Sequence, residues 1–450
     1  MIEWYYATFF LLGSVLGLML LGMPVAIAFI GANIAGAIYF MGGYGDFLSQ
    51  ASRGIGQLLN NAFPSLTTFN LIPVPMFLLM GELFFHGGLA NRMFGAVEVL
   101  MGRLPGRLSY VTVAGGTAFA TLSGSSMGST ALLGSLMVPE MTNRGYKKHM
   151  SIGPILGTGG LAMLIPPSAL AVLLGTLAQL DIGKLLMGGI MPGIILAAMY
   201  VLLIWFQCRI DPAAAPAYDV ELPPLSRRLM LFVRDVLPML SVIIGVIFLI
   251  MYGIATPSES AAFGCLGVLL LCVIFRTLSW KAIVNATAGA LRVTVMAFLI
   301  IFGSATFSAL LAFSGASSGL LAWATSFDLA PLTMLLIMFG ILLILGMFMD
   351  QLSMMLLTVP IYFPLATQLG FDPIWFGVII LLALEISFTT PPFGLLLFVM
   401  KGVAPPDTKM TDIYWAAIPF ILCALTVVAL IIVFPPVSYT HLTLPTILLV

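Results

Sequence analysis

Charged residues are scarce in this sequence, and so are histidines and cysteines. Only 8% of the 450 residues are Asp, Glu, Lys or Arg, whereas a soluble domain carries about 25%. The three histidines are scattered and the four cysteines form no CxxC pair, so neither a histidine-based metal centre nor a disulfide framework is indicated. The formal net charge is zero, which gives no reason to expect a nucleic-acid partner.

Sequence signatures of catalysis are also missing. The chain has no GxxxxGK[ST] phosphate-binding loop and no nucleophile–base constellation. It has no hydrophilic stretch large enough to form a soluble catalytic domain. We therefore expect neither ATP hydrolysis nor any other enzymatic activity, and we expect any transport to be secondary.

Long apolar runs dominate the sequence instead. Hydrophobic residues make up 61% of the chain and gather in runs of about 20 residues, the length that crosses a bilayer as an α-helix. This composition predicts an all-α polytopic membrane protein in a lipid bilayer. The uninterrupted runs are 5–21, 24–42, 66–85, 185–207, 235–252, 258–275, 291–312 and 413–434.

Further apolar segments are broken in the middle. "TLSGSSMGST" interrupts 109–141, "IPPS" interrupts 151–180, "GMFMDQLS" interrupts 331–368 and "TTPPFG" interrupts 374–400. Proline breaks a helix, and each unmet backbone polar group costs several kcal/mol in hydrocarbon. Pro and Gly are common in membrane helices and Ser/Thr often only join helices, but interruptions in matched pairs favour a binding site.

The order of spans and breaks repeats along the chain. Corresponding prolines are Pro24 and Pro257, Pro139 and Pro360, and Pro166 and Pro391. If 109–141 and 331–368 are re-entrant hairpins, each half crosses the membrane five times, one crossing being a broken helix, and the halves are inverted. We expect a first repeat over 1–208, a cytoplasmic linker over 209–234 and a second repeat over 235–436. Residues 437–450 are assigned to neither repeat.

The distribution of basic residues predicts the orientation. With the N-terminus outside, fifteen of the seventeen Lys and Arg residues fall in inside loops, and only Arg53 and Lys184 remain outside. This agrees with the positive-inside rule. The separation would be lost if the hairpins crossed fully, so the same count favours re-entrant hairpins and places both termini outside.

A helix broken inside a protein-lined cavity exposes N–H groups on one side of the break and carbonyls on the other. The N–H ends suit anionic groups, and the carbonyls with nearby hydroxyls suit a small hard cation such as sodium. We expect one cation site where the first hairpin tip meets the first double-proline break. Its candidate ligands are Ser123, Ser125, Ser126, Gly160, Pro166 and Ser168.

A second cation site is expected where the tip of 331–368 meets the other double-proline break. Its candidate ligands are Gly346, Asp350, Thr389, Thr390 and Pro391. Acidic residues within the membrane are functional candidates by default. No basic residue lies in the hairpin of Asp350, so either a bound cation supplies the charge, or the carboxyl is protonated, or it faces water. Glu385 is a ligand or a support of the break.

Hydroxyl groups beside the breaks are the candidate contacts to a substrate: Ser126, Thr130, Ser168, Ser353 and Thr390. "TPSE", Thr256 to Glu259, has a structural interpretation only. It predicts a helix start closed by a capping box, with proline at the first helical position.

Several stretches together resemble a known family. "GSSMGSTALLGSLMVPEM", "GGLAMLIPPSALAVLLG", "GIATPSESAA" and "EISFTTPPFGLLLFV" are similar to the large membrane subunit of TRAP transporters, the tripartite ATP-independent periplasmic family. The resemblance covers about residues 4–436. It implies sodium-driven import of an organic acid, often a C4-dicarboxylate or sialic acid, across the bacterial inner membrane. It also implies Na⁺ as the coupling ion and an elevator motion of the hairpins and broken helices against a scaffold.

The resemblance further implies two protein partners, a small four-helix membrane subunit and a periplasmic substrate-binding protein. Two other classes stay open at this point. One is a stand-alone sodium-coupled carboxylate transporter of the same superfamily, which needs no binding protein. The other is a non-transporting membrane protein, such as a channel or an intramembrane enzyme.

Overall fold

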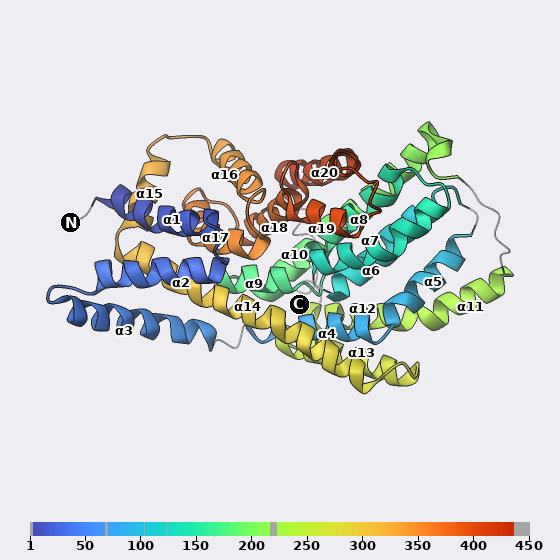
Figure 1. Cartoon of the computed structure of the whole chain (residues 1–450), viewed down its shortest axis with the longest axis horizontal. Coiled ribbons are helices and arrows are strands. Elements are labelled where there is room, and N and C mark those ends of the chain that lie inside the picture. Colours follow the sequence, from blue (N-terminus) through green and yellow to red (C-terminus); the bar gives the residue numbers. More distant parts are fainter. Residues whose placement is uncertain (1–2, 68–70, 103, 124, 217–222, 436–450) are drawn as a thin grey trace, which may run out of the picture.

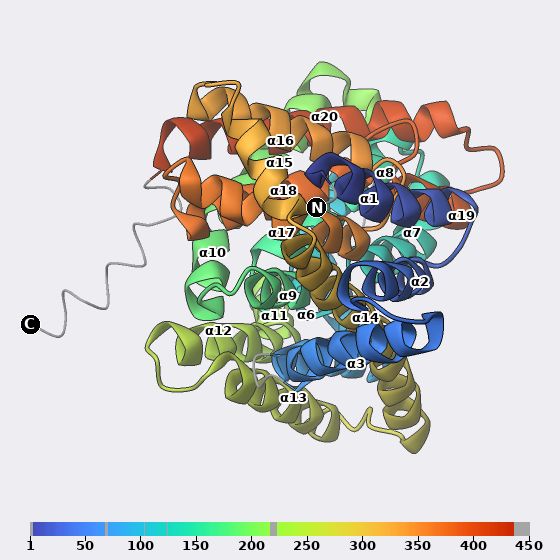
Figure 2. The same ribbon diagram turned by 90° about the vertical axis from the view of Figure 1, so that its left-hand side faces the viewer.

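The computed structural model describes residues 3–67, 71–102, 104–123, 125–216 and 223–435, and this part of the chain is helical with no β-strand. Figures 1 and 2 both place α3, α12 and α13 on one side of the molecule and α16, α18 and α20 on the other. The long helix α14 runs between them and packs against α2, α3 and α4. The polytopic helical class predicted from composition is confirmed.

The first half of the chain contains a run of spans, a helical hairpin and a broken helix. Its elements are α1 (Trp4–Leu20), α2 (Val25–Gly36) with a π-helical turn (Ala37–Met41), α3 (Phe47–Leu66), α4 (Pro73–His86), α5 (Leu89–Met101), α6 (Arg107–Ser123), α7 (Ser126–Asn143), α8 (Lys148–Leu164), α9 (Ala169–Leu177) and α10 (Ile182–Ile210).

A short 3₁₀ turn (Pro212–Ala214) leads into the second half. Its elements are α11 (Leu225–Asp235), α12 (Leu237–Met251), α13 (Pro257–Ile274), α14 (Trp280–Phe313), α15 (Ala316–Thr325), α16 (Pro331–Leu345), α17 (Gln351–Gln368), α18 (Pro373–Thr389), α19 (Leu395–Val403) and α20 (Met410–Val433).

By length and composition, α10, α13, α14 and α20 can each cross a membrane. Three bent pairs pass the same criterion together: α4 with α5 at 66°, α8 with α9 at 45°, and α11 with α12 at 43°. The described chain therefore has up to seven spans of this kind, besides shorter apolar helices such as α1, α16 and α18.

The structure ends a helix at each interruption seen in the sequence. α6 and α7 meet at a tip near Ser125, and α16 and α17 meet at a tip that ends at Asp350. The double prolines separate α8 from α9 and α18 from α19, and the bond between the two prolines is cis in both breaks. The capping box of Thr256 and Glu259 is present with Pro257 at the first helical position, as predicted.

Some helices were not predicted. The predicted span 66–85 is wrong at its start, because α3 ends at Leu66 and α4 begins only at Pro73. α3 itself was missed because polar residues such as Arg53 and Gln57 interrupt its apolar pattern. The predicted span 291–312 lies within α14, which is 34 residues long and begins at Trp280. Arg292 therefore lies within a helix rather than a loop.

The predicted linker 209–234 contains helical residues at both ends. Its first residues continue α10, and its last ones form most of α11. Charge and proline suggested a loop, but apolar and basic residues alternate at helical spacing in "LSRRLMLFVRD". Residues 217–222 of the linker and 437–450 of the unassigned tail lie outside the described residues.

The two halves of the chain interlock. α7 of the first hairpin packs against α19, the second arm of the later broken helix. α17 of the second hairpin packs against α9, which is the second arm of the first broken helix. Gly134 permits the first contact, because a Cβ at this position would overlap the side chain of Val403. Each hairpin is therefore supported by a segment from the opposite half.

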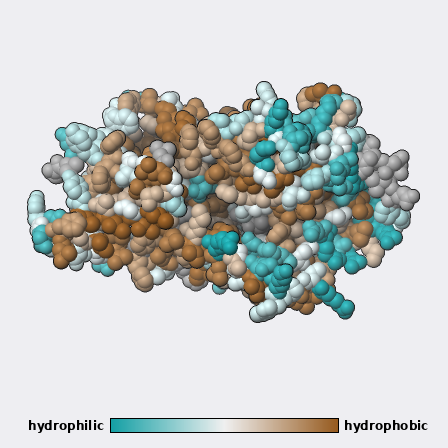
Figure 3. Space-filling model, viewed as in Figure 1, coloured by the Kyte–Doolittle hydropathy of each residue, from teal (hydrophilic) through white to brown (hydrophobic). Residues whose placement is uncertain are grey.

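Hydrophilic side chains gather at one end of the molecule, around α5, α11 and the ends of the first hairpin (Figure 3). Ion pairs connect these elements: Arg92 Nη2 lies 2.6 Å from Asp235 Oδ1, and Arg144 Nη1 lies 3.3 Å from Glu98 Oε1. Lys147 donates a hydrogen bond to Asp211 and thereby lowers the pKa of that carboxyl. This is the end that the positive-inside rule assigns to the cytoplasm.

Candidate functional site

A cavity of about 270 Å³ lies where the two hairpin tips meet. The first residues of three helices line it: Ser126 of α7, Ala169 of α9 and Gln351 of α17. Apolar side chains of α4 and α14, including Leu78 and Met296, form the opposite wall. Helix N-termini carry a partial positive charge and free N–H groups, so their convergence favours an anionic ligand.

The first hairpin tip contributes two serines to this cavity. Ser125 is the N-cap of α7, and its Oγ accepts a hydrogen bond of 3.1 Å from Gly128 N. Ser126 is buried, and its hydroxyl has no hydrogen-bond partner in the described part of the chain. Gly124 and the side chain of Ser123 lie outside what the structure describes. Among the described residues of this tip, Ser126 therefore has a hydroxyl that is open to a ligand.

Thr130 lies one turn further along α7 and faces α8 rather than the cavity. Its buried hydroxyl has no partner among the described residues, and a Cβ on Gly159 would lie 2.9 Å from its Oγ1. The absence of a side chain at Gly159 thus lets the hairpin approach α8 closely. The first hairpin therefore meets the first arm of the broken helix at Gly159, whereas the first cation site is predicted where the tip meets the break at Pro166 and Ser168.

The first double-proline break turns the chain at Pro166 and starts α9 at Ala169. Ser168 is fully buried and caps α9, with its Oγ accepting a 3.2 Å hydrogen bond from Ala171 N. Neither Ser168 nor Pro166 is among the described residues that line the cavity. Gly160 faces away from the tip, because the carboxyl group of Glu385 lies against its Cα.

Asp350 is the one charged side chain among the described residues that line the cavity. It is the N-cap of α17: its Oδ2 accepts hydrogen bonds from Leu352 N and Ser353 N at 3.1 and 3.3 Å, and Oδ1 accepts one from Ser353 Oγ. The hydroxyl of Ser353 is thus directed at Asp350. The sequence predicted the tip position of Asp350 but not this capping role.

Gln351 follows Asp350 and was missed from the sequence. Its side chain is buried, it lines the cavity, and its amide nitrogen has no hydrogen-bond partner in the described part of the chain. The only sequence feature that could have identified Gln351 as a site residue was its position directly after Asp350, at the start of a helix. Together with Ser126 it provides unpaired donors on both tips.

The second double-proline break lies beside the second tip but not on the cavity. Gly346 packs directly against Ser387 of α18, where a Cβ on the glycine would overlap the serine side chain. Thr389 and Thr390 donate their hydroxyl protons to carbonyls of their own helix, with Thr389 Oγ1 3.0 Å and Thr390 Oγ1 2.6 Å from Ile386 O. The hydroxyl oxygens can still accept or bind a cation. Pro391 follows in the turn.

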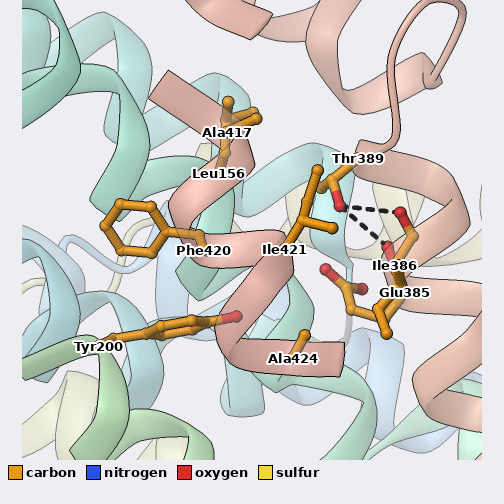
Figure 4. Close-up of a pocket in the computed structure, with 10 residues that line it drawn as sticks. Leu156, Tyr200, Glu385, Ile386, Thr389, Ala417, Phe420, Ile421 and Ala424 are labelled. Atoms are coloured by element: carbon orange, nitrogen blue, oxygen red, sulfur yellow. Dashed lines mark hydrogen bonds between the residues drawn. The ribbon is translucent and has the colours of Figure 1, made fainter. Parts of the chain in front are cut away.

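A second, much smaller cavity of about 10 Å³ lies behind this break (Figure 4). The carboxyl of Glu385 from α18 and the hydroxyl of Tyr200 from α10 point into it, beside Phe420 and Ala424 of α20. Glu385 is 3% exposed and its Oε2 has no partner among the described residues. A space of this size holds about one water. Glu385 therefore contacts α8 and α10 rather than the cavity between the tips.

Comparison with known families decides the class of this protein. Residues 12–437 match the family described as "Tripartite ATP-independent periplasmic transporter, DctM component". The chain belongs to this family. The TRAP resemblance read from its motifs is therefore confirmed, and the chain is a membrane transporter component rather than an enzyme.

Two curated TRAP relatives match almost end to end. The C4-dicarboxylate TRAP transporter large permease protein DctM of Rhodobacter capsulatus is 30% identical, over 97% of this chain and 98% of its own. The sialic acid TRAP transporter large permease protein SiaM of Vibrio cholerae serotype O1 is 29% identical, over 93% and 95%. Membership as the large component of a tripartite TRAP system implies a small membrane subunit and a periplasmic binding protein as partners.

A solved structure shares the fold at much lower identity. The Alcanivorax borkumensis YdaH transporter superposes with a TM-score of 0.62 at 14% identity, over 86% of this chain and 90% of the other. At this identity the likeness describes the helical architecture alone.

Proposed function

We propose that this TRAP large permease imports an organic acid, such as a C4-dicarboxylate or a sialic-acid-like carboxylate, together with Na⁺. The observation that carries the proposal is the cavity between the tips, onto which three helices direct their first residues. Ser126 Oγ and Gln351 Nε2 line the same cavity, and neither has a hydrogen-bond partner among the residues that the structure describes. Donors of this kind and positive helix ends suit a carboxylate.

Sodium coupling is supported by the charge of Asp350. A carboxylate substrate in this cavity would share it with the carboxylate of Asp350, and like charges disfavour each other's ionised form. A cation bound near the tip removes that repulsion, so substrate and cation would bind together. We place the two sodium sites where the sequence analysis predicts them, one where the first tip at Ser126 meets the break at Pro166 and Ser168, and one where the second tip at Asp350 meets the break at Thr390.

An elevator movement is supported by the division of the helices into two packing groups. The hairpins pack against the broken helices, which in turn pack against α20, whereas α4 packs mainly against α13 and α14 and less extensively against α6 and α9. α5 and α15 connect these groups, and each begins after a glycine of positive φ, Gly88 at 70° and Gly315 at 75°. We propose that the hairpins and broken helices move as one body, that the repeats are inverted, and that a periplasmic protein delivers the substrate.

Sodium-driven uptake tests the proposal directly. Proteoliposomes containing this chain with its small subunit should accumulate a carboxylate only with its binding protein and an inward sodium gradient. Asp350→Asn should raise the sodium concentration for half-maximal uptake, because Asn still caps a helix well but carries no charge. Asp372→Asn is the matched control, since Asp372 caps α18 with the same kind of hydrogen bonds at an exposed position.

The alternatives for Asp350 predict other outcomes in the same assay. Uptake that depends on pH at saturating sodium would indicate a protonated carboxyl instead of a bound cation. Wild-type curves for Asp350→Asn at both pH values would leave Asp350 as a capping residue only. Accumulation without sodium would contradict the proposed coupling.

Substitution of Gln351 tests the substrate site. Gln351→Leu keeps a similar volume and removes the donor, so it should raise the substrate concentration for half-maximal uptake by about tenfold or more, because a hydrogen bond to a charged group contributes about 1.5–3 kcal/mol. Thr426→Val, at an exposed position of α20, is the control. An unchanged substrate dependence in Gln351→Leu would remove this residue from the site.

Labelling from the two sides of the membrane tests the orientation. We expect the N-terminus and C-terminus outside, the first hairpin open to the cytoplasm and the second to the periplasm, because basic residues divide fifteen to two. An impermeant thiol reagent added outside should reach cysteines placed near Asp328 and Asp372. It should not reach positions near Arg144 or Arg228, and the reverse pattern would invert the assignment.

A further inference from the structure

The helix α11 presents three distinct faces. Leu225, Leu229 and Val233 are spaced by four residues and so share one side of the helix. Their exposed fractions are 62%, 48% and 55%. In the described part of the chain, no residue covers the exposed surface of these three apolar side chains. It continues into exposed apolar residues of α12, such as Leu237.

A second face is basic and borders the apolar one. Arg227 and Arg234 are seven residues apart, which places them nearly in line along the helix. Both are exposed, and Met230, 65% exposed, lies between them and the apolar row. An apolar stripe flanked by arginines is the pattern of a helix that lies in the plane of a membrane interface.

The third face binds the rest of the protein. Arg228 donates hydrogen bonds to the carbonyls of Val99, at 2.9 Å, and Leu100, at the end of α5. Asp235 accepts a hydrogen bond from Arg92 Nη2 at 2.6 Å, and the Arg92 guanidinium stacks 4.4 Å from the Phe275 ring centroid. These contacts fix the rotation of α11 about its axis. The apolar and basic faces are therefore held outward and are not free to turn inward.

The bend between α11 and α12 fits the same picture. α12 is strongly apolar, and α11 meets it at 43°. A bend of 43° tilts α11 away from the axis of α12 and toward the membrane plane. Since the end of the molecule that carries α11 is also its most hydrophilic end (Figure 3), that surface is the one rich in basic residues.

We propose that α11 is an interfacial helix that binds anionic phospholipid, with Leu225, Leu229 and Val233 at the acyl boundary and Arg227 and Arg234 on the lipid phosphates. Charge complementarity identifies the occupant: Arg227 is exposed, and Arg234, although its Nε lies 3.8 Å from Asp235 Oδ1, is 59% exposed, so both guanidinium groups remain accessible to lipid phosphates that an apolar helix would not offer. Through Arg228 and Asp235, the lipid surface then sets the position of α5. This inference does not depend on which substrate is transported.

Spin labels test where the apolar face lies. The native cysteines are replaced, and the full chain with a single Leu229→Cys or Val233→Cys is labelled and placed in nanodiscs containing phosphatidylglycerol. We expect the labels to be relaxed by oxygen, which concentrates in the lipid, and protected from an aqueous nickel complex. A label at Ala213→Cys, an exposed position of the 3₁₀ turn, should show the opposite. Equal access of nickel to Leu229→Cys and Ala213→Cys would overturn the proposal.

Lipid titration tests the basic face. Native mass spectrometry of the purified chain should show tighter binding of phosphatidylglycerol than of phosphatidylcholine. The double variant Arg227→Gln/Arg234→Gln should lose about fivefold in phosphatidylglycerol affinity per arginine. Arg53→Gln, an exposed arginine of α3, should lose none. Unchanged affinity in the double variant would contradict a lipid-binding role. The same conclusion would follow if adding the small subunit shielded the Leu229→Cys label from both oxygen and nickel.

Discussion

Gly160→Ala should abolish most transport and lower the stability of the protein. A Cβ at this position would overlap the carboxyl group of Glu385, which is buried between α8, α10 and α20. The carboxyl has little room to move, because the adjoining cavity measures only about 10 Å³. Overpacking of this kind costs about 1–3 kcal/mol. Thermal unfolding in detergent and uptake in proteoliposomes measure the two effects.

Controls separate overlap from a general effect of alanine. Gly245→Ala in α12 has no atom within 4 Å of the added Cβ, so it should leave the unfolding temperature unchanged or slightly raised. The double variant Gly160→Ala/Glu385→Asp withdraws the carboxyl by one methylene and should recover part of the stability. A stable, active Gly160→Ala variant would mean that α8 and α18 do not meet as described.

Gly346→Ala should have the second large effect, on sodium dependence as well as stability. Gly346 closes α16 just before the second tip, and an added Cβ would overlap Ser387 of α18 and lie 2.9 Å from Met354 Cε. The tip would be displaced from the break, so the ligands of the proposed second sodium site would separate. Uptake measured across sodium concentrations should show a weaker apparent sodium affinity.

Compensation provides the stringent test of this contact. Ser387→Gly removes the side chain that the new methyl group would strike, so Gly346→Ala/Ser387→Gly should regain sodium affinity relative to Gly346→Ala. Gly340→Ala lies on the same helix with no atom within 4 Å of the new Cβ and should behave like the wild type. Failure of the double variant to recover would assign the defect to something other than this overlap.

Local chemistry made the breaks predictable from the sequence. Paired prolines cannot continue a helix, and serine or aspartate before a helix is a cap. The ends of α8 and α18 could therefore be expected beside Pro166 and Pro391, whereas the caps formed by Ser168 and Asp350 were not predicted. The same reasoning found the capping box at Thr256. These signals are local, and they need no knowledge of the partner helices.

Surface helices and long-range contacts could not be predicted in the same way. α3 and α11 are amphipathic, so a search for continuous apolar runs passes over them. Nothing in the sequence shows that Gly160 faces Glu385, or that Ser126 and Gln351 line one cavity. Such contacts are set by how helices distant in sequence pack. The hydroxyls of Thr389 and Thr390 were candidate cation ligands, and the sequence does not show that their protons are donated to Ile386 O.

The interlocked packing of the two halves also constrains how the protein is made. α7 rests on α19 and α9 rests on α17, so the first hairpin and the first broken helix leave the ribosome well before their supports exist. Contacts of such long sequence separation form slowly, because the entropy of closing the intervening chain must first be overcome. The surfaces of α7 and α9 that contact α19 and α17 therefore remain unpacked in the membrane until the second half of the chain has been synthesised.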